Sequence, residues 1–355
     1  MKRRQLLLAG LASAAPLAQA APLDGDGPCG SVALLWRAGR LVSLRAQGSA
    51  DLAGQRPMQA DAIVRIYSMS KVVTSAAAQC LANDGRLALD EPLADVLPGM
   101  PRGVRVRHLH THSAGWPVEG EAVAALDLDD AASLADYAER VARLPLQAAP
   151  GSRFAYDGLH TEVLARAIEV RAGQPFERFV HERLLAPLAM PDTGWQVPAA
   201  QRGRIVDLVQ VDDAGRRSAT PPDGKPLKRY ASGAGGLYST AGDYLRFCRM
   251  LLAGGELDGR RVLSREHCAE MLRNQLDAGV ESAPGQGFGL GGAVQLDPAR
   301  SAWPGPAGQY GWLGAAGTWF RIDPSREQVA LFFAQVLPAK PAGALAREFF
   351  ASVQT

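Results

Sequence analysis

Strand-like segments lie at both ends of this chain and helical segments fill the stretch between them, which limits the folds that the chain can adopt. The strand-like segments are residues 31–35 and 41–47 near the N-terminus and residues 318–322 and 329–334 near the C-terminus. Each pair flanks a short turn-forming segment, 38–40 or 323–325, so each pair is expected to form a hairpin. We therefore expect an α+β fold in which both chain ends build one antiparallel sheet with flanking helices, and the middle forms a large, mostly helical insertion.

Gly- and Pro-rich loops, such as 283–292, divide the middle of the chain. The helices expected between these loops cover residues 68–83, 134–144, 161–171, 175–185, 241–252 and 264–274. A further helix over 342–350 is expected to close the chain. We assign residues 21–67 and 300–355 to the sheet-containing part of a single domain, and residues 68–299 to its helical part.

The first 20 residues have the composition of an export signal. Residues 1–4 are basic, residues 5–17 are apolar, and residues 18–20 read Ala-Gln-Ala, which matches a cleavage site. The apolar stretch is too short to span a bilayer, which takes about 20 residues. The pair of arginines at its start also resembles a twin-arginine signal. We expect a cleaved signal peptide over 1–20 and a mature domain over 21–355 that is periplasmic or secreted.

Net charge and cysteine spacing exclude several classes of partner. The formal charge of +2 gives no electrostatic reason to expect nucleic acid. No later segment is long and apolar enough to predict a membrane span. The four cysteines match neither a disulfide framework nor a zinc pattern, although export would permit disulfides. Cys80 lies in an Ala-rich run, where a free thiol that packs as a small apolar group is the simplest interpretation.

Ser68 and Lys71 form an S-x-x-K sequence at the start of a helix that is expected to be buried. Residues 72–82 are apolar nearly all round, and residues 83–85 supply a stop signal. Lys71 lies one turn after Ser68 on the same face. Burial disfavours an ammonium ion and lowers the pKa of a lysine, so Lys71 is expected to accept the proton of Ser68. The helix N-terminus would also favour an oxyanion there. The alternative is a lysine that snorkels to the surface beside a serine that only caps the helix.

Several further segments resemble, in the right order, the signatures of one enzyme superfamily. They are residues 65–71 (RIYSMSK), 108–115 (HLHTHSAG), 150–156 (PGSRFAY), 187–193 (PLAMPDT), 235–240 (GGLYST) and 254–264 (GGELDGRRVLS). The resemblance is to the serine β-lactamase superfamily, and it covers residues 31–350. It is strongest to the class C β-lactamase-like group, and within that group to the family VIII carboxylesterases and related acyltransferases. It implies a serine hydrolase with Ser68 as nucleophile and Lys71 as the neighbouring base.

The second catalytic element of this superfamily is Y-x-N, in which the tyrosine serves as partner base and acid. The matching residues here are Tyr156-Asp157-Gly158, so the tyrosine is kept and the asparagine is replaced by Gly158. A phenol needs a nearby cation to act as a base near neutral pH, and Lys71 would supply it. The resemblance thus makes Tyr156 a catalytic candidate and Gly158 a substrate-binding position. The alternative is a tyrosine whose hydroxyl only caps a loop.

The third element is K-T-G or H-x-G on the strand beside the nucleophile. The matching residues are Trp312-Leu313-Gly314, and W-x-G is typical of the esterase branch. Gly314 would let substrate approach the strand edge, and the backbone N–H groups of Ala315 and Ser68 would form an oxyanion hole. Trp312 offers no cation to a substrate carboxylate, which weakens any prediction of β-lactam or peptide recognition. The alternative is a tryptophan of the core with no role in the site.

Other active-site patterns are missing or incomplete in the sequence. No G-x-S-x-G nucleophile elbow is present, and His181 is not followed by the second histidine of H-E-x-x-H. The glycine-rich segment 287–292 does not stand between a strand and a helix, as a dinucleotide site requires. His108, His110 and His112 lie close together, but no carboxylate or cysteine accompanies them at ligand spacing. We therefore expect neither a metal nor a cofactor.

Three functions fit this sequence. The first is the hydrolysis of small carboxylic esters through an acyl-enzyme on Ser68, with Lys71 and Tyr156 sharing the proton transfers. The second is the hydrolysis of β-lactams or of D-amino-acid peptides of the cell wall. The third is a catalytically silent binding protein that senses peptidoglycan or a related ligand. In each case the expected partner is a small ester or amide, and the oligomeric state is left open.

Overall fold

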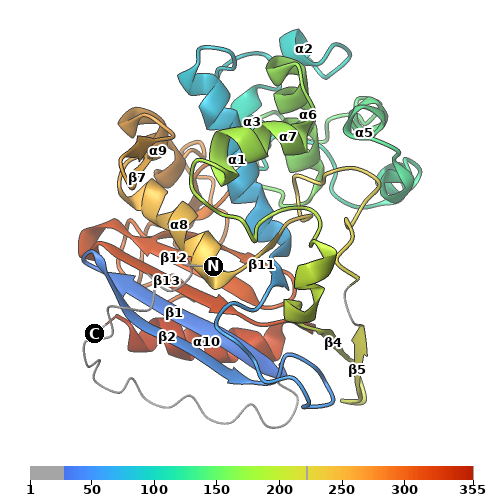
Figure 1. Ribbon diagram of the computed structural model, residues 1–355. Helices are drawn as coiled ribbons and strands as arrows, with labels where there is room; N and C mark the ends of the chain where they lie inside the picture. The colour runs from blue at the N-terminus through green and yellow to red at the C-terminus, as the bar shows by residue number, and fades with distance from the viewer. Residues whose placement is uncertain (1–27, 221–222, 355) are drawn as a thin grey trace.

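The sheet expected from the two chain ends is the centre of the computed structural model, which describes residues 28–220 and 223–354 (Figure 1). It has seven strands. In spatial order they are β2 (Arg40–Gly48), β1 (Gly30–Arg37), β13 (Gln328–Phe333), β12 (Thr318–Asp323), β11 (Tyr310–Gly314), β10 (Ala293–Gln295) and β9 (Gln286–Phe288). All neighbouring strands are antiparallel, and both expected hairpins, β1–β2 and β12–β13, are present. The predicted α+β fold is confirmed.

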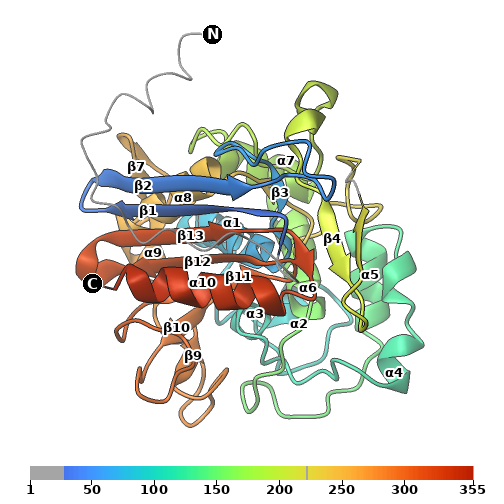
Figure 2. The same cartoon turned by 90° about the horizontal axis from the view of Figure 1, so that it is seen from below.

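The two faces of this sheet pack against different helices. Val329 and Leu331 of β13 belong to the large core that includes α8 (Ala241–Leu252), whereas Phe332 packs in a second core with α10 (Lys340–Ser352). Alternate side chains of a strand point to opposite faces, so a strand that is covered on both faces is apolar at nearly every position. Figure 2 shows α10, the expected closing helix, lying across the outer face of the sheet.

The remaining helices form most of the upper part of the molecule in Figure 1. They are α1 (Ser70–Asn83), α2 (Leu93–Val96), α3 (Val106–His110), α4 (Glu121–Ala124), α5 (Leu134–Val141), α6 (Leu159–Ala172), α7 (Phe176–Val180) and α9 (Arg265–Leu272). Helix α1 is buried along nearly its whole length, as its apolar sequence predicts, and it packs against α6 and α9. It ends at Asn83, and Gly85 follows with φ of +68°, a conformation that glycine adopts without steric cost.

Seven strands, β4 to β10, lie in the part of the described chain that was expected to be mostly helical, and two of them belong to the large sheet. β9 and β10 add to one edge of the sheet before residue 300, and β9 falls within the segment 283–292 that was expected to be a loop. Each has three residues, which is too short for an alternating pattern to show in the sequence. The smaller sheets contain β3 (Val64–Arg65) and β6 (Tyr238–Ser239), then β4 (Leu208–Val211), β5 (Arg217–Thr220) and β14 (Val336–Leu337), then β7 (Glu256–Leu257) and β8 (Arg260–Arg261).

Three further expectations concern export, membranes and cysteines. The expected signal peptide, residues 1–20, lies outside the described residues. Among the helices that the structure describes, none is both long and apolar enough to cross a membrane. All four cysteines belong to the described part of the chain and are free thiols, and three of them are buried. The simple interpretation of Cys80 as a buried free thiol is confirmed.

Candidate active site

Ser68 lies in a sharp turn between the short strand β3 and helix α1. The chain makes one 3-10 turn, η2 (Tyr67–Met69), before α1 begins at Ser70. Tyr67 has φ of 44°, in the left-handed region that is sterically costly for a residue with a side chain. The α-helix therefore begins two residues later than predicted, and Ser68 lies in the 3-10 turn that leads into it. The turn leaves Ser68 partly exposed at the end of a buried helix.

Lys71 is placed to interact directly with Ser68. Its Nζ donates to Ser68 Oγ at 3.0 Å and to the backbone oxygen of Ala234 at 2.8 Å. The residue is only 3% exposed, so it does not snorkel to the surface, which was the alternative interpretation. A buried lysine whose amine is held on a serine hydroxyl has the geometry of a nucleophile with its base.

A buried carboxylate holds the loop that carries Ala234. Glu162 of α6 accepts hydrogen bonds from Ser232 Oγ and from the backbone N–H of Gly233, the latter at 3.0 Å. Thr74 of α1 donates to the backbone oxygen of Gly233 at 2.8 Å from the other side. Burial raises the pKa of Glu162, and these hydrogen bonds act against that rise. Together these contacts position the carbonyl oxygen that receives Lys71.

Tyr156 and Trp312 meet beside this pair. The indole Nε1 of Trp312 donates to the hydroxyl oxygen of Tyr156 at 3.0 Å, and the two ring centres are 4.9 Å apart. Lys71 Nζ lies 5.1 Å from the centre of the Tyr156 ring. Trp312 thus lies in the site, rather than in a core remote from it, and fixes the position of the phenol oxygen. This hydrogen bond was not expected from the sequence.

Gly314 allows strand β11 to run close beside the Ser68 turn. A Cβ atom at this position would lie 2.3 Å from the backbone oxygen of Ile66 and 2.3 Å from Thr318 Oγ1, which is far inside van der Waals contact. The glycine is therefore needed for a close approach of backbone to backbone, a use that differs from the expected role of admitting substrate. Ala315 follows directly and is exposed, and its part in an oxyanion hole stays a prediction.

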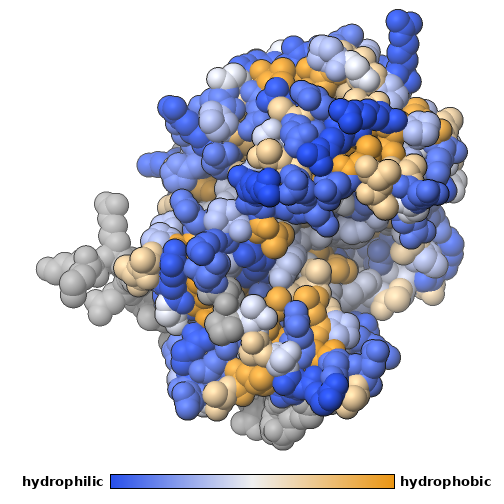
Figure 3. Space-filling view, turned by 90° about the vertical axis from the view of Figure 1, so that its right-hand side faces the viewer, coloured by the Kyte–Doolittle hydropathy of each residue, from blue (hydrophilic) through white to orange (hydrophobic). Residues whose placement is uncertain are grey.

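Gly158 borders a cavity of about 490 Å³ next to the site. Its missing side chain faces Ala234, whose Cβ would be 3.5 Å from a Cβ at 158. The apolar part of the lining comes from Val118, Val123, Ala124, Leu128, Leu159 and Leu227. Leu227 is one of the few large apolar side chains exposed in the described chain, at 45%. Figure 3 views the side of the molecule on which α5 lies in Figure 1, and hydrophilic side chains cover most of that face between separate apolar patches.

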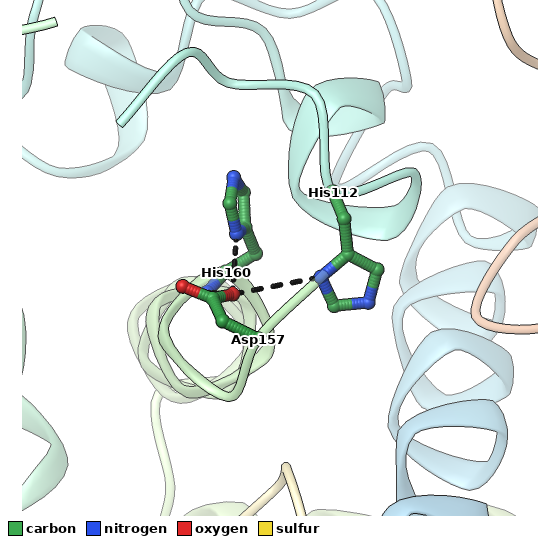
Figure 4. Close-up of side chains that lie close together, drawn as sticks. All are labelled: His112, Asp157 and His160. Carbon is green, nitrogen blue, oxygen red and sulfur yellow. Dashed lines mark hydrogen bonds and ion pairs between the residues drawn. The ribbon is translucent and has the colours of Figure 1, made fainter. Parts of the chain in front are cut away.

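The three clustered histidines of the sequence do not converge on one point. His108 Nδ1 accepts from the backbone of Arg105, and His110 Nδ1 lies 2.9 Å from Ser75 Oγ. His112 instead faces Asp157 and His160, which no sequence spacing linked to it (Figure 4). Its Nδ1 is 3.6 Å from Asp157 Oδ1, and His160 Nδ1 is 2.6 Å from the same oxygen.

The structure therefore brings together the candidates that were taken from separate motifs. Ser68, Lys71, Tyr156 and Trp312 form a continuous series of contacts, with Gly314 behind the serine. The sequence did not single out Ala234, Glu162 or His160, because a backbone carbonyl and two ordinary helix residues carry no local signal.

Comparison with known proteins places the chain in a family. The protein is 33% identical over 347 residues to Protein Rv1367c of Mycobacterium tuberculosis (strain ATCC 25618 / H37Rv). This match covers 87% of this chain and 86% of the relative. It is 32% identical over 328 residues to Esterase EstB of Burkholderia gladioli, with 82% of each chain covered. The solved structure of EstCE1, a hydrolase with promiscuous acyltransferase activity, superposes with a TM-score of 0.81 at 24% identity and covers 92% of this chain and 94% of its own. The family model described as Beta-lactamase matches residues 22–353. The resemblance seen in the sequence is thus confirmed, and the chain belongs to the β-lactamase family of serine hydrolases and related proteins.

Proposed function

We propose that this protein hydrolyses small carboxylic esters through an acyl-enzyme on Ser68. Two contacts carry the proposal: buried Lys71 donates to Ser68, and Trp312 donates to Tyr156. Trp312 stands at the position where the β-lactamase pattern has a cation. The relationship to Esterase EstB supports the choice of esters.

In the proposed mechanism Ser68 Oγ attacks the ester carbonyl carbon, and its proton passes to Lys71 Nζ or to Tyr156. The N–H groups of Ser68 and Ala315 would hold the oxyanion. The tetrahedral intermediate expels the alcohol, which takes up the proton, and Ser68 remains acylated. Water then attacks the acyl carbon, and the same groups accept its proton and return one to Ser68. No step requires a metal or a cofactor.

The cavity beside Gly158 is the place where we expect the acyl group to bind. It is lined in part by Ala234, whose carbonyl oxygen accepts from Lys71, so it lies one residue away from the Ser68–Lys71 pair. Its lining combines apolar side chains with several carboxylates, among them Asp127 and Asp129, and both features favour an uncharged acyl chain over a charged acid. Because a glycine at 158 leaves this opening free of a side chain, the same residue favours esters and removes a contact that a β-lactam would use.

A β-lactam would lose two polar partners here. The β-lactamase pattern has a side-chain amide at the position of Gly158 and a cation at the position of Trp312. A neutral hydrogen bond contributes about 0.5–1.5 kcal/mol and a charge-assisted one about 1.5–3 kcal/mol. Their joint loss of roughly 2–4.5 kcal/mol corresponds to about 30- to 2,000-fold in rate if all of it is expressed in the transition state.

The test compares kcat/KM for p-nitrophenyl butyrate and nitrocefin on one preparation of the mature protein. We expect the ester to be the better substrate by at least the lower end of that range, and Trp312→Lys to narrow the gap. If nitrocefin matched or exceeded the ester, the protein would act as a β-lactamase. If neither substrate were turned over and Ser68 were not acylated, the proposal would be replaced by a silent binding role.

Export through a cleaved signal over residues 1–20 is part of the same proposal, and N-terminal sequencing of the secreted protein tests it.

A further inference from the structure

Behind Tyr156 lies a buried group of three side chains, His112, Asp157 and His160, that the proposed mechanism does not use (Figure 4). The carboxylate of Asp157 lies between the two imidazoles. Both histidines are fully buried, and the side chain of Asp157 is 12% exposed. Asp157 directly follows Tyr156 in the chain, so the contacts that hold its carboxylate also help to hold the backbone of Tyr156.

The hydrogen bonds of His160 fix which of its nitrogens carries the proton. Its Nε2 accepts the backbone N–H of Ala114 at 3.3 Å, so Nε2 is unprotonated. The proton of the neutral ring must then be on Nδ1, which donates to Asp157 Oδ1 at 2.6 Å. A metal bound at Nδ1 would need a lone pair on that nitrogen. The ring proton would then move to Nε2, where it would clash with the N–H group of Ala114. The arrangement therefore fits a histidine–carboxylate hydrogen bond better than a metal site.

His112 is the unusual member of the group. Neither of its ring nitrogens has a hydrogen-bond partner among the described residues, because its distance of 3.6 Å to Asp157 Oδ1 exceeds hydrogen-bond range. Its backbone adopts φ of 52°, a strained conformation for a residue with a side chain. Its backbone oxygen accepts from Ala155, and its ring centre is 4.7 Å from that of Tyr156. A buried, strained and unpaired histidine against a catalytic candidate indicates a functional constraint.

The ionisation states of the group are set by burial and by mutual contact. Burial lowers the pKa of His112 to about 4, so the ring is neutral at pH 7. Burial opposes ionisation of Asp157, but the adjacent imidazoles, above all His160 with its hydrogen bond, outweigh it and hold the pKa of this carboxyl well below its usual range. The group therefore carries one negative charge at neutral pH.

We propose that Asp157 is a positioning residue that acts through His112: the carboxylate orients the imidazole against the Tyr156 ring and places a negative charge beside the groups that transfer the Ser68 proton. His160 holds the carboxylate in place. The inference rests on the proposed function, because it assigns a role to these residues in proton transfer from Ser68.

Asp157 is not the only ionisable group near Tyr156. The other groups packed around the cluster are Lys71 on α1, His110 at the end of α3, Tyr137 on α5 and Glu162 on α6. Burial lowers the pKa of His110 to about 3, and burial raises the pKa of Tyr137 far above its usual value, so both are neutral. Glu162 holds the loop beside Lys71 through Ser232 and Gly233, and it interacts electrostatically with Lys71 but makes no contact with His112. Asp157 is therefore the carboxylate that touches the histidine beside Tyr156.

The variant Asp157→Asn separates charge from shape. The amide oxygen takes the place of Oδ1, the atom that faces both imidazoles, so it can still accept from His160 in a side chain of unchanged shape. Only the negative charge is lost. Because an anion raises the pKa of a neighbouring base, its removal should move the acid limb of the kcat/KM profile for p-nitrophenyl butyrate to lower pH, by on the order of one unit.

A second variant tests the orienting role. His112→Asn tolerates the left-handed backbone but removes the ring that lies against Tyr156. We expect kcat to fall about 10- to 100-fold with little change in KM, because the phenol is needed for proton transfer and not for substrate binding. Asp136→Asn, which removes a partly exposed carboxylate that pairs with Arg140 on α5, is the control and should change neither the pH profile nor kcat.

The rate at which a fluorophosphonate labels Ser68, measured against pH, gives a second readout that does not depend on ester turnover. A parallel shift of the labelling profile in Asp157→Asn supports the proposal. If the acid limb and the labelling profile of Asp157→Asn coincide with those of the unmodified protein, the carboxylate is only structural and the proposal is wrong. A shift to higher pH would also overturn it. If the unmodified protein is labelled at Ser68 but does not hydrolyse esters, the proposed function fails while the labelling profile still decides the role of Asp157.

Discussion

Replacing Gly314 with alanine should disable the site by displacing β11 from the Ser68 turn. The added Cβ would meet the backbone oxygen of Ile66 and Thr318 Oγ1, each at 2.3 Å, whereas ordinary contacts begin near 3.4 Å. The strand or the turn must therefore move by about 1 Å, since Ile66 presents backbone rather than a flexible side chain. Overpacking of this kind costs about 1–3 kcal/mol of stability. A displacement of about 1 Å between catalytic groups can lower the rate about 100-fold.

The assay is kcat/KM for p-nitrophenyl butyrate, together with thermal unfolding of the same samples. Gly343→Ala is the matched control, because the nearest atom to its added Cβ is 3.7 Å away and Gly343 lies within helix α10, where alanine is favoured. We expect Gly314→Ala to lose about two orders of magnitude in kcat/KM and Gly343→Ala to keep full activity. If Gly314→Ala retained the kcat/KM and the stability of the unmodified protein, the close approach would not be what positions Ser68, and the reasoning would be refuted.

Ser68→Ala should abolish both turnover and labelling by a fluorophosphonate, and peptide mass spectrometry that found the label on another serine would contradict the assignment. Lys71→Arg should be nearly as damaging as Lys71→Ala, each losing about 10²–10⁴ in rate, because arginine does not deprotonate in the useful range; a nearly fully active arginine variant would exclude Lys71 as the base. Trp312→Phe should lower kcat about 10-fold while leaving KM nearly unchanged, because it keeps an aromatic ring but removes the donor to Tyr156, and a change confined to KM would count against this role. Burial raises the pKa of Asp243 to about 6, so the stability that its protonated form provides is complete below pH 4 and is lost as the pH rises through 6; Asp243→Asn should therefore be more stable than the unmodified protein at pH 8 and not at pH 4, as thermal unfolding at the two pH values would show.

Those parts of the fold that depend on local patterns could be predicted from the sequence. The strands β1, β2, β12 and β13 have apolar runs bounded by clear turns, and the long helices have apolar faces and stop signals. Ser68 and Lys71 are three residues apart, so one helical turn brings them together whatever the rest of the chain does. Tyr156 and Trp312 were found only through resemblance to a family, since nothing in their neighbouring residues links them to Ser68.

The remainder depends on contacts between distant segments. Glu162 belongs to an ordinary-looking helix, and its function in holding the Ala234 loop arises only when α6 packs beside that loop. The pairing of His112 with Asp157 likewise joins two loops that are far apart in the chain, so no spacing in the sequence indicates it. From the sequence, Gly314 was expected to admit substrate, whereas in the structure it lies against the backbone of Ile66. Which segment packs against a glycine depends on the tertiary fold, so the sequence does not indicate this contact.

The order in which the strands lie in the sheet also has a consequence for when the serine becomes reactive. β1 pairs with β13, which joins the first and last strands of the large sheet, and β11 takes its place beside the Ser68 turn within that same sheet. During synthesis, the nucleophile and its lysine emerge from the ribosome long before the strand that holds Trp312. Pairing between such remote segments is a late, non-local event in folding. If Ser68 is the nucleophile, as proposed, it therefore becomes reactive only after the last strands have been synthesised and have paired with the sheet.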